Sequence, residues 1–126
     1  MSSKNIHVIC NSDDLKSGGT GVKFNVTVGS QPVPAFVVRF EGSVYAYLNR
    51  CAHMMLELDW DDAEYFDTSG EFLICSNHGA LYEPNTGVCV NGPCYGASLI
   101  AISVKEVDSM IVLEDDRFEI HHTENS

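Results

Sequence analysis

The sequence predicts an all-β protein built from short antiparallel strands, and three observations favour this class. Short runs rich in β-branched and aromatic side chains recur along the chain, as is typical of strands. Glycine, proline, asparagine, aspartate or serine residues bound these runs. No segment of ten or more residues shows the apolar spacing that an amphipathic helix needs.

The first expected elements lie in the N-terminal part of the chain. Residues 6–10 form a short apolar run, residues 12–16 fit one helical turn, and residues 22–28 alternate with period two. Residues 35–40 follow a Pro-x-Pro entry, and residues 44–48 run almost directly up to a cysteine. Each run predicts a strand, apart from the single helical turn.

The later elements continue the same pattern. Residues 72–74, 101–107 and 110–113 are apolar runs and predict further strands. Residues 41–43 and 107–109 carry turn-forming side chains and predict hairpins. No internal repeat interrupts this series, so we expect one domain over residues 1–126.

Composition excludes several classes of function. No run of 18 apolar residues exists, which excludes a membrane-spanning helix, and the first ten residues do not resemble a signal peptide. We therefore expect a cytoplasmic protein. Eighteen acidic against seven basic residues give a formal net charge of −11, which argues against nucleic acid and anionic lipid as partners and favours a partner with a basic face.

One acidic segment departs from the strand pattern. Residues 57–71 hold seven acids and no lysine or arginine, with Trp60, Tyr65 and Phe66 among them. We expect a loop or short hairpin whose aromatic side chains pack against the body of the protein.

Two short motifs carry metal-binding chemistry. Cys51 and His53 form a Cys-x-His pair, Cys75 and His78 form a Cys-x-x-His pair, and 21 residues separate His53 from Cys75. Each pair follows an apolar strand, so the two loops can bring four ligands to one point. Thiolate and imidazole ligands suit an iron–sulfur cluster with mixed ligands or a structural zinc ion. The other histidines, at positions 7, 121 and 122, are interpreted as ordinary polar residues.

The chain resembles the Rieske [2Fe–2S] family, and most closely its stand-alone ferredoxins. The resemblance runs from about residue 36 to residue 113 and includes Asn49-Arg50, His78-Gly79-Ala80-Leu81-Tyr82, Thr86-Gly87, Gly92-Pro93 and Ser98-Leu99. It implies stacked sheets with two cluster-binding loops and one [2Fe–2S] cluster, with Cys51 and Cys75 on one iron and His53 and His78 on the other. It also implies that Pro93 belongs to a third loop covering the cluster.

The resemblance implies a tuning of the cluster as well. High-potential members carry a serine after the His-Gly pair and a tyrosine two positions later, where this chain has Ala80 and Tyr82. We therefore expect a potential near the low end of the family range of about −150 to +300 mV.

The remaining cysteines are interpreted by position. The disulfide that links the cluster loops of membrane-bound Rieske proteins falls on Leu56 and Asn77 here, so it cannot form. Cys89 and Cys94 could pair, or these two residues and Cys10 are buried thiols.

The expected function is electron transfer without substrate chemistry of its own, because the chain shows no mononuclear iron site, flavin fold or nucleotide-binding loop. The resemblance implies a carrier between a reductase and a terminal oxygenase or other redox enzyme. Two alternatives stay open: a small subunit of a larger oxidoreductase, similar to nitrite reductase, and a zinc-stabilised binding module.

Overall fold

The computed structural model describes residues 8–28, 30–49, 64–67, 69–75, 79–92, 96–115 and 117–120. The strands are β1 (Val8–Asn11), β2 (Val22–Val28), β3 (Gln31–Phe40), β4 (Ser43–Leu48), β5 (Leu73–Ile74), β6 (Leu81–Tyr82), β7 (Cys89–Asn91), β8 (Ala101–Ile102), β9 (Val104–Val107), β10 (Met110–Leu113) and β11 (Glu119–Ile120). A single 3₁₀ turn, η1 (Ser12–Asp14), follows β1.

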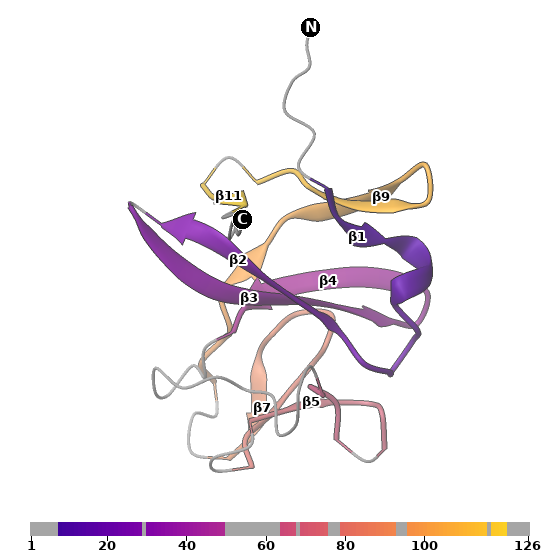
Figure 1. Cartoon of the computed structure of the whole chain (residues 1–126). Helices are drawn as coiled ribbons and strands as arrows, with labels where there is room; N and C mark the ends of the chain where they lie inside the picture. The colour runs from indigo at the N-terminus through magenta and orange to yellow at the C-terminus, as the bar shows by residue number, and fades with distance from the viewer. Residues whose placement is uncertain are drawn as a thin grey trace, which may run out of the picture.

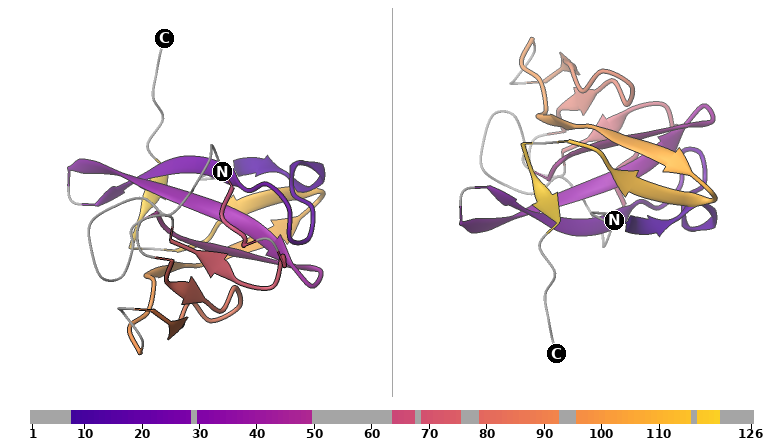
Figure 2. Two further views of the ribbon diagram at one scale, coloured as in Figure 1. Left: turned by 90° about the horizontal axis from the view of Figure 1, so that it is seen from below. Right: turned by 90° about the horizontal axis from the view of Figure 1, so that it is seen from above.

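Three antiparallel sheets are stacked in layers (Figure 1). The middle sheet has the strand order β11-β2-β3-β4-β8, the upper sheet has the order β1-β10-β9, and the lower sheet has the order β5-β6-β7. Viewed from above in Figure 2, the orange and yellow strands of the upper sheet cross in front of the purple middle sheet. The predicted fold class, short antiparallel strands in stacked sheets, is confirmed.

The side chains of the middle sheet alternate between its two faces, and each face packs against another sheet. Along β3, Phe36 and Val38 face the lower sheet, whereas Ala35 and Val37 face the upper sheet. The sheet therefore separates two hydrophobic cores. The lower core comprises Phe36, Val38, Tyr47, Tyr65, Phe66, Leu73, Cys75, Ala80, Tyr82, Cys89 and Leu99. The upper core comprises Leu15, Val26, Val33, Ala35, Val37, Ala46, Leu48, Ile102, Ile111, Leu113 and Phe118.

Both predicted hairpin turns are confirmed. Phe40 pairs with Ser43 across Glu41 and Gly42, whose φ angles are 51° and 86°. Val107 pairs with Met110 across a second two-residue turn with φ angles of 52° and 65°. Positive φ at both central positions gives a turn whose twist matches that of the flanking strands.

The third strand begins earlier than predicted, at Gln31 instead of Ala35. Pro32 and Pro34 lie inside it, although proline has no N–H group to donate. They are tolerated because β3 pairs with β2 along this stretch, while its register with β4 begins only at Ala35. The carbonyl oxygen of Pro34 accepts a hydrogen bond from the Asn49 N–H group at 2.8 Å.

The predicted strand over residues 101–107 is divided in two, β8 and β9. Ser103 interrupts it, because its N–H group donates to the carboxylate of Asp115 at 2.9 Å. Three strands were not predicted, namely β6, β7 and β11, and each has only two or three residues. Within the part of the chain described here, no helix is long and apolar enough to span a bilayer.

Candidate metal centre

Cys75 directly follows β5, and both its N–H group and its carbonyl oxygen are hydrogen-bonded. We call residues 73–75, with Gly79 and Ala80, the second stem. Its N–H group donates to the Ala80 carbonyl oxygen at 2.9 Å, and its own carbonyl oxygen accepts from the Gly79 N–H group at 2.9 Å. Gly79 has a φ of 70°, a conformation that glycine adopts without strain. Cys75 itself is completely buried, at 0 % exposure. The stem of the second ligand loop is therefore closed and shielded from water.

Of the other predicted ligands, Cys51, His53 and His78 lie outside the described residues, as does Pro93 in the third loop. Their convergence on one point stays a prediction. What the structure does describe is the approach to the first ligand pair, where β4 ends at Leu48 and Asn49 follows it, completely buried.

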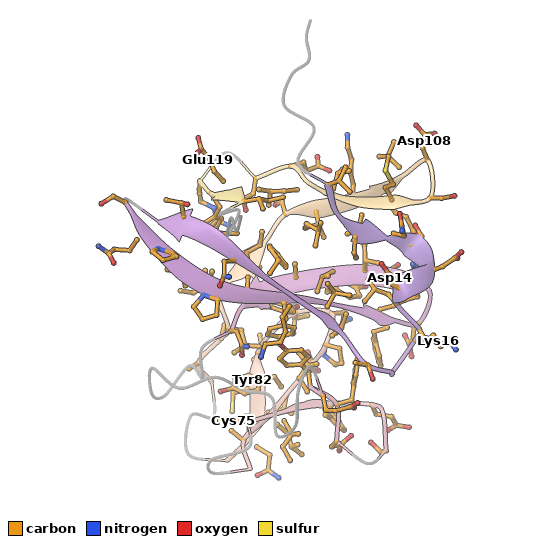
Figure 3. All side chains as sticks on the ribbon, viewed as in Figure 1. Asp14, Lys16, Cys75, Tyr82, Asp108 and Glu119 are labelled. Atoms are coloured by element: carbon orange, nitrogen blue, oxygen red, sulfur yellow. The ribbon has the colours of Figure 1, made fainter. Side chains whose placement is uncertain are left out.

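The two predicted tuning residues lie beside the second stem. Ala80 and Tyr82 are both completely buried, and Tyr82 pairs with Leu73 and Cys89 in the lower sheet. Figure 3 shows Cys75 and Tyr82 at the lower end of the molecule, away from Asp108 at the upper end. This placement fits the predicted role of Ala80 and Tyr82, which is to tune a cluster bound by Cys75.

The third loop begins in close contact with the second stem. A Cβ atom added at Gly92 would lie 2.8 Å from the Cα atom of Ala80, so only glycine permits this approach. The φ of Gly92 is 109°, a second reason for glycine. The third loop therefore begins at Gly92, in contact with Ala80, which lies five positions after Cys75. A loop that covers a cluster bound by Cys75 is expected to begin close to this residue.

The described end of the acidic segment forms a short hairpin, as predicted. The Asp67 N–H group donates to the Phe72 carbonyl oxygen at 2.9 Å, and Phe66 pairs with Leu73. Tyr65 and Phe66 are buried in the lower core, which confirms that aromatic side chains pack this segment on the body. Trp60 lies outside the described residues.

Two more cysteines are described, and neither belongs to the predicted ligand set. Cys89 is completely buried, and its Sγ donates to the Asn91 carbonyl oxygen at 3.3 Å. Cys10 is half-buried on β1, and burial, with a smaller effect of Asp14, raises its pKa to about 11. A thiol with this pKa is protonated at neutral pH and is a poor metal ligand. Cys94 lies outside the described residues, so its pairing with Cys89 stays a prediction.

The donor chemistry around Cys75 fits a [2Fe–2S] cluster. Cys75 offers a soft sulfur donor and is completely buried, and the same core contains the phenol of Tyr82, a group that can tune a nearby sulfur atom. In the described ranges, no group of three or more histidine, cysteine, aspartate or glutamate side chains gathers that could hold a metal ion, and three of the four predicted ligands lie outside these ranges. Sequence reasoning did not show that Asn49 is buried where the chain approaches the first ligand pair, although Asn49 was noted as part of the resemblance.

Comparisons with known proteins identify the family of this chain. The model of the Rieske [2Fe-2S] domain matches residues 5–111. The ferredoxin of carbazole 1,9a-dioxygenase from Nocardioides aromaticivorans IC177 is 25 % identical, with 90 % of this chain and 100 % of that chain covered and a TM-score of 0.68. No curated protein matches.

Two further solved structures share the fold. The Sphingomonas yanoikuyae B1 ferredoxin is 21 % identical, with 88 % of this chain and 99 % of that chain covered and a TM-score of 0.67. A chain from the complex of reduced oxygenase and oxidized ferredoxin in carbazole 1,9a-dioxygenase is 23 % identical, with 88 % and 94 % covered and a TM-score of 0.69. Because the family model covers most of the sequence and the fold agrees, the chain belongs to the Rieske [2Fe-2S] domain family.

Proposed function

We propose that this Rieske-type ferredoxin carries one electron at a time from a reductase to a terminal oxygenase or another redox enzyme. The observation that carries the proposal is the alignment with the Nocardioides ferredoxin, which includes 100 % of that chain at 25 % identity. A ferredoxin is thus matched along its whole length. A second neighbour comes from a complex between a ferredoxin and its oxygenase, which supports the choice of partner.

The proposed cofactor is one [2Fe–2S] cluster held by Cys51, His53, Cys75 and His78. When bound, such a cluster supplies a centre that accepts and releases one electron. The thiolates of Cys51 and Cys75 would favour a ferric iron, and the neutral imidazoles of His53 and His78 would make an iron easier to reduce. On the protein side, the closed stem at Cys75 orients one ligand and excludes water from it.

We further propose that the chain is a single cytoplasmic domain and performs no substrate chemistry of its own. The stacked sheets support a single domain, because the middle sheet contributes to both cores. The full-length match to a ferredoxin supports the second part.

Purified protein tests the cofactor, and a native extract tests the carrier role. We expect a red-brown protein with two irons and two acid-labile sulfides per chain, whereas one zinc ion and no sulfide would establish a zinc-stabilised module. In size-exclusion chromatography of a native extract, an electron carrier should elute apart from its oxygenase. Co-elution with a large oxidoreductase would instead support a fixed subunit, similar to that of nitrite reductase.

The net charge of −11 supports a partner with a basic docking face. Surface charges act mainly on the rate of encounter, and the Debye length is about 8 Å at physiological salt. We expect the rate of reduction by the true partner to fall steeply as salt rises, while the reduction potential barely changes. A flat salt dependence would contradict electrostatic docking.

Charge-neutralising variants locate the docking acids within the protein. Asp59, Asp61 and Asp62 lie in the acidic segment, and their change to asparagine should mimic high salt in stopped-flow measurements. Asp115 is unsuitable for the control, because its carboxylate is bonded to Arg117 at 2.7 Å and is almost buried. Exposed carboxylates outside the ligand motifs serve better, namely Glu41, Asp108 and Glu119. Equal slowing by both sets would contradict docking through the acidic segment.

A further inference from the structure

Tyr65 connects the backbone segments that precede the two cysteine ligands. Its carbonyl oxygen accepts a hydrogen bond from the Ile74 N–H group at 2.8 Å, and Ile74 directly precedes Cys75. At its other end, the phenolic oxygen of Tyr65 accepts a hydrogen bond from Asn49 Nδ2 at 3.2 Å. Asn49 lies two positions before Cys51. One residue is therefore bonded to both ligand stems.

The ring of Tyr65 is held so firmly that it can act as a rigid connector. It stacks on Phe36 with ring centroids 3.9 Å apart and an interplanar angle of 12°. On another side it approaches Gly21, where an added Cβ atom would lie 3.0 Å from Tyr65 Cδ2. A side chain that is packed in this way and completely buried keeps one rotamer.

Asn49 fixes the position of the end of β4 relative to Tyr65. Its amide is completely buried, and burying an amide is unfavourable unless it is hydrogen-bonded. Its backbone N–H group donates to the Pro34 carbonyl oxygen at 2.8 Å, which ties the same residue to the middle sheet. The end of β4 therefore has one position in which its buried polar groups reach their partners.

We propose that Tyr65 is a positioning residue that holds the two cysteine stems at a fixed separation and thereby retains the cluster. The proposal rests on the ligand set proposed above. A covalent tie between the loops is excluded at Leu56 and Asn77, since neither is cysteine. The Asn49–Tyr65–Ile74 connection supplies a non-covalent tie in the stems instead.

The test compares two buried tyrosine hydroxyl groups. Tyr65→Phe removes the phenolic oxygen and keeps the ring on Phe36. The matched control is Tyr47→Phe, because Tyr47 is also buried in the lower core and its hydroxyl donates to the Pro84 carbonyl oxygen at 2.8 Å, at a turn that bears no ligand. For both loaded variants and the wild type, the measurements are the rate of bleaching in excess chelator and the electron paramagnetic resonance spectrum of the reduced protein.

We expect Tyr65→Phe to bleach about tenfold faster than the wild type, which corresponds to about 1.4 kcal/mol of barrier. Its spectrum should broaden, because stems of variable separation give clusters of variable geometry. Tyr47→Phe should bleach at nearly the wild-type rate and keep sharp lines. Equal bleaching rates and unchanged spectra in the two variants would overturn the positioning role while leaving the electron-carrier proposal intact. A wild-type protein without cluster would overturn both.

Asn49→Ala provides a second, independent variant. It removes the amide donor and leaves the Tyr65 hydroxyl in place. If the two residues act as one connection, the double variant should bleach no faster than the faster single variant. Additive acceleration would show that they act separately and would contradict the connection.

Discussion

The two cores on either side of the middle sheet differ in the kind of side chain that fills them. In the upper core every buried member is aliphatic except Phe118. The lower core contains five aromatic rings and two thiols, with Phe36, Tyr47, Tyr65, Phe66, Tyr82, Cys75 and Cys89 among its members. Phenols need hydrogen-bond partners when they are buried, so the lower core is restricted by hydrogen bonds as well as by volume.

The strands differ in the same sense. Around the upper core, β2 and β3 pair over seven consecutive residues, and period-two alternation suffices to bury the apolar side chains. Around the lower core, β5 and β6 have two residues each, and single hydrogen bonds and glycine contacts hold the loops. Regular pairing thus builds the two sheets around the upper core, while individual contacts shape the end of the molecule that carries the predicted ligand Cys75.

The difference between the two cores predicts that the largest loss of cluster follows from substitution of Cys75, one of the two cysteines of the lower core. Cys75→Ala should abolish the cluster, because no other side chain replaces a thiolate ligand at this stem. Cys89→Ala removes an equally buried thiol and should keep the cluster, with a loss of roughly 1 kcal/mol in the free energy of unfolding. Iron content and visible absorbance distinguish the two variants. A red-brown Cys75→Ala protein would contradict the ligand assignment.

The same measurement tests the histidine ligands. His53→Ala and His78→Ala should give colourless protein, whereas His121→Ala and His122→Ala should retain two irons. A colourless His121→Ala protein would show that the paired spacing does not define the site.

Glycine contacts predict the next largest effect. Gly92→Ala places a Cβ atom 2.8 Å from Ala80 Cα at a φ of 109°, and we expect a loss of roughly 2–4 kcal/mol in the free energy of unfolding. Gly42→Ala also stands at positive φ, 86°, but has open space around it, so about 1 kcal/mol is expected. Urea denaturation measures both losses. Equal losses would mean that the Gly92–Ala80 contact is unimportant.

A smaller effect is expected on the reduction potential. Ala80→Ser should raise it, because a hydroxyl beside Cys75 can donate to a sulfur atom, and Tyr82→Phe should lower it. One such bond is worth about 1.5–3 kcal/mol at most, and only the difference between the redox states counts, so shifts of roughly tens of millivolts are expected. Ala46→Ser, at a buried position of the upper core, is the control and should leave the voltammogram unchanged.

The smallest effect belongs to an ion pair between the middle and upper sheets. Arg39 donates to both carboxylate oxygens of Glu106, at 3.2 and 2.8 Å, and these hydrogen bonds lower the pKa of Glu106 to about 2. A lowered folded-state pKa stabilises the protein above the unfolded pKa of 4.5, and this stabilisation is lost as the pH falls from about 4.5 towards about 2. Glu106→Gln should therefore weaken the pH dependence of the melting temperature below about pH 4.5. An unchanged slope would show that solvent screens the pair completely.

Many of the strands and turns could be predicted from sequence, because the residue patterns that define them are local. Period-two alternation defined β2 with both its bounds, and turn residues located both hairpins. The start of β3 was missed because proline normally argues against a strand, and only the pairing pattern shows why it is tolerated there.

The ligand pattern of the site stays a prediction from sequence, whereas the contacts that support Cys75 are known only from the structure. The spacing of Cys75 and His78 is a local pattern and therefore allows a prediction, whereas the contact of Gly92 with Ala80 and the bond between Asn49 and Tyr65 join residues far apart in the chain. β6 and β7 were missed because two or three residues are too few for a period to be visible.

The prolines of β3 also affect how the chain meets copies of itself. An exposed strand edge is a template for intermolecular strand addition and hence for aggregation. In a strand, the N–H and C=O groups of one residue point to the same side, and the Pro34 carbonyl oxygen points to Asn49, away from β2. Pro32, two residues earlier, faces the same way. A second chain would therefore find two hydrogen-bond donors missing on this edge, and the stretch is a poor template for fibril growth.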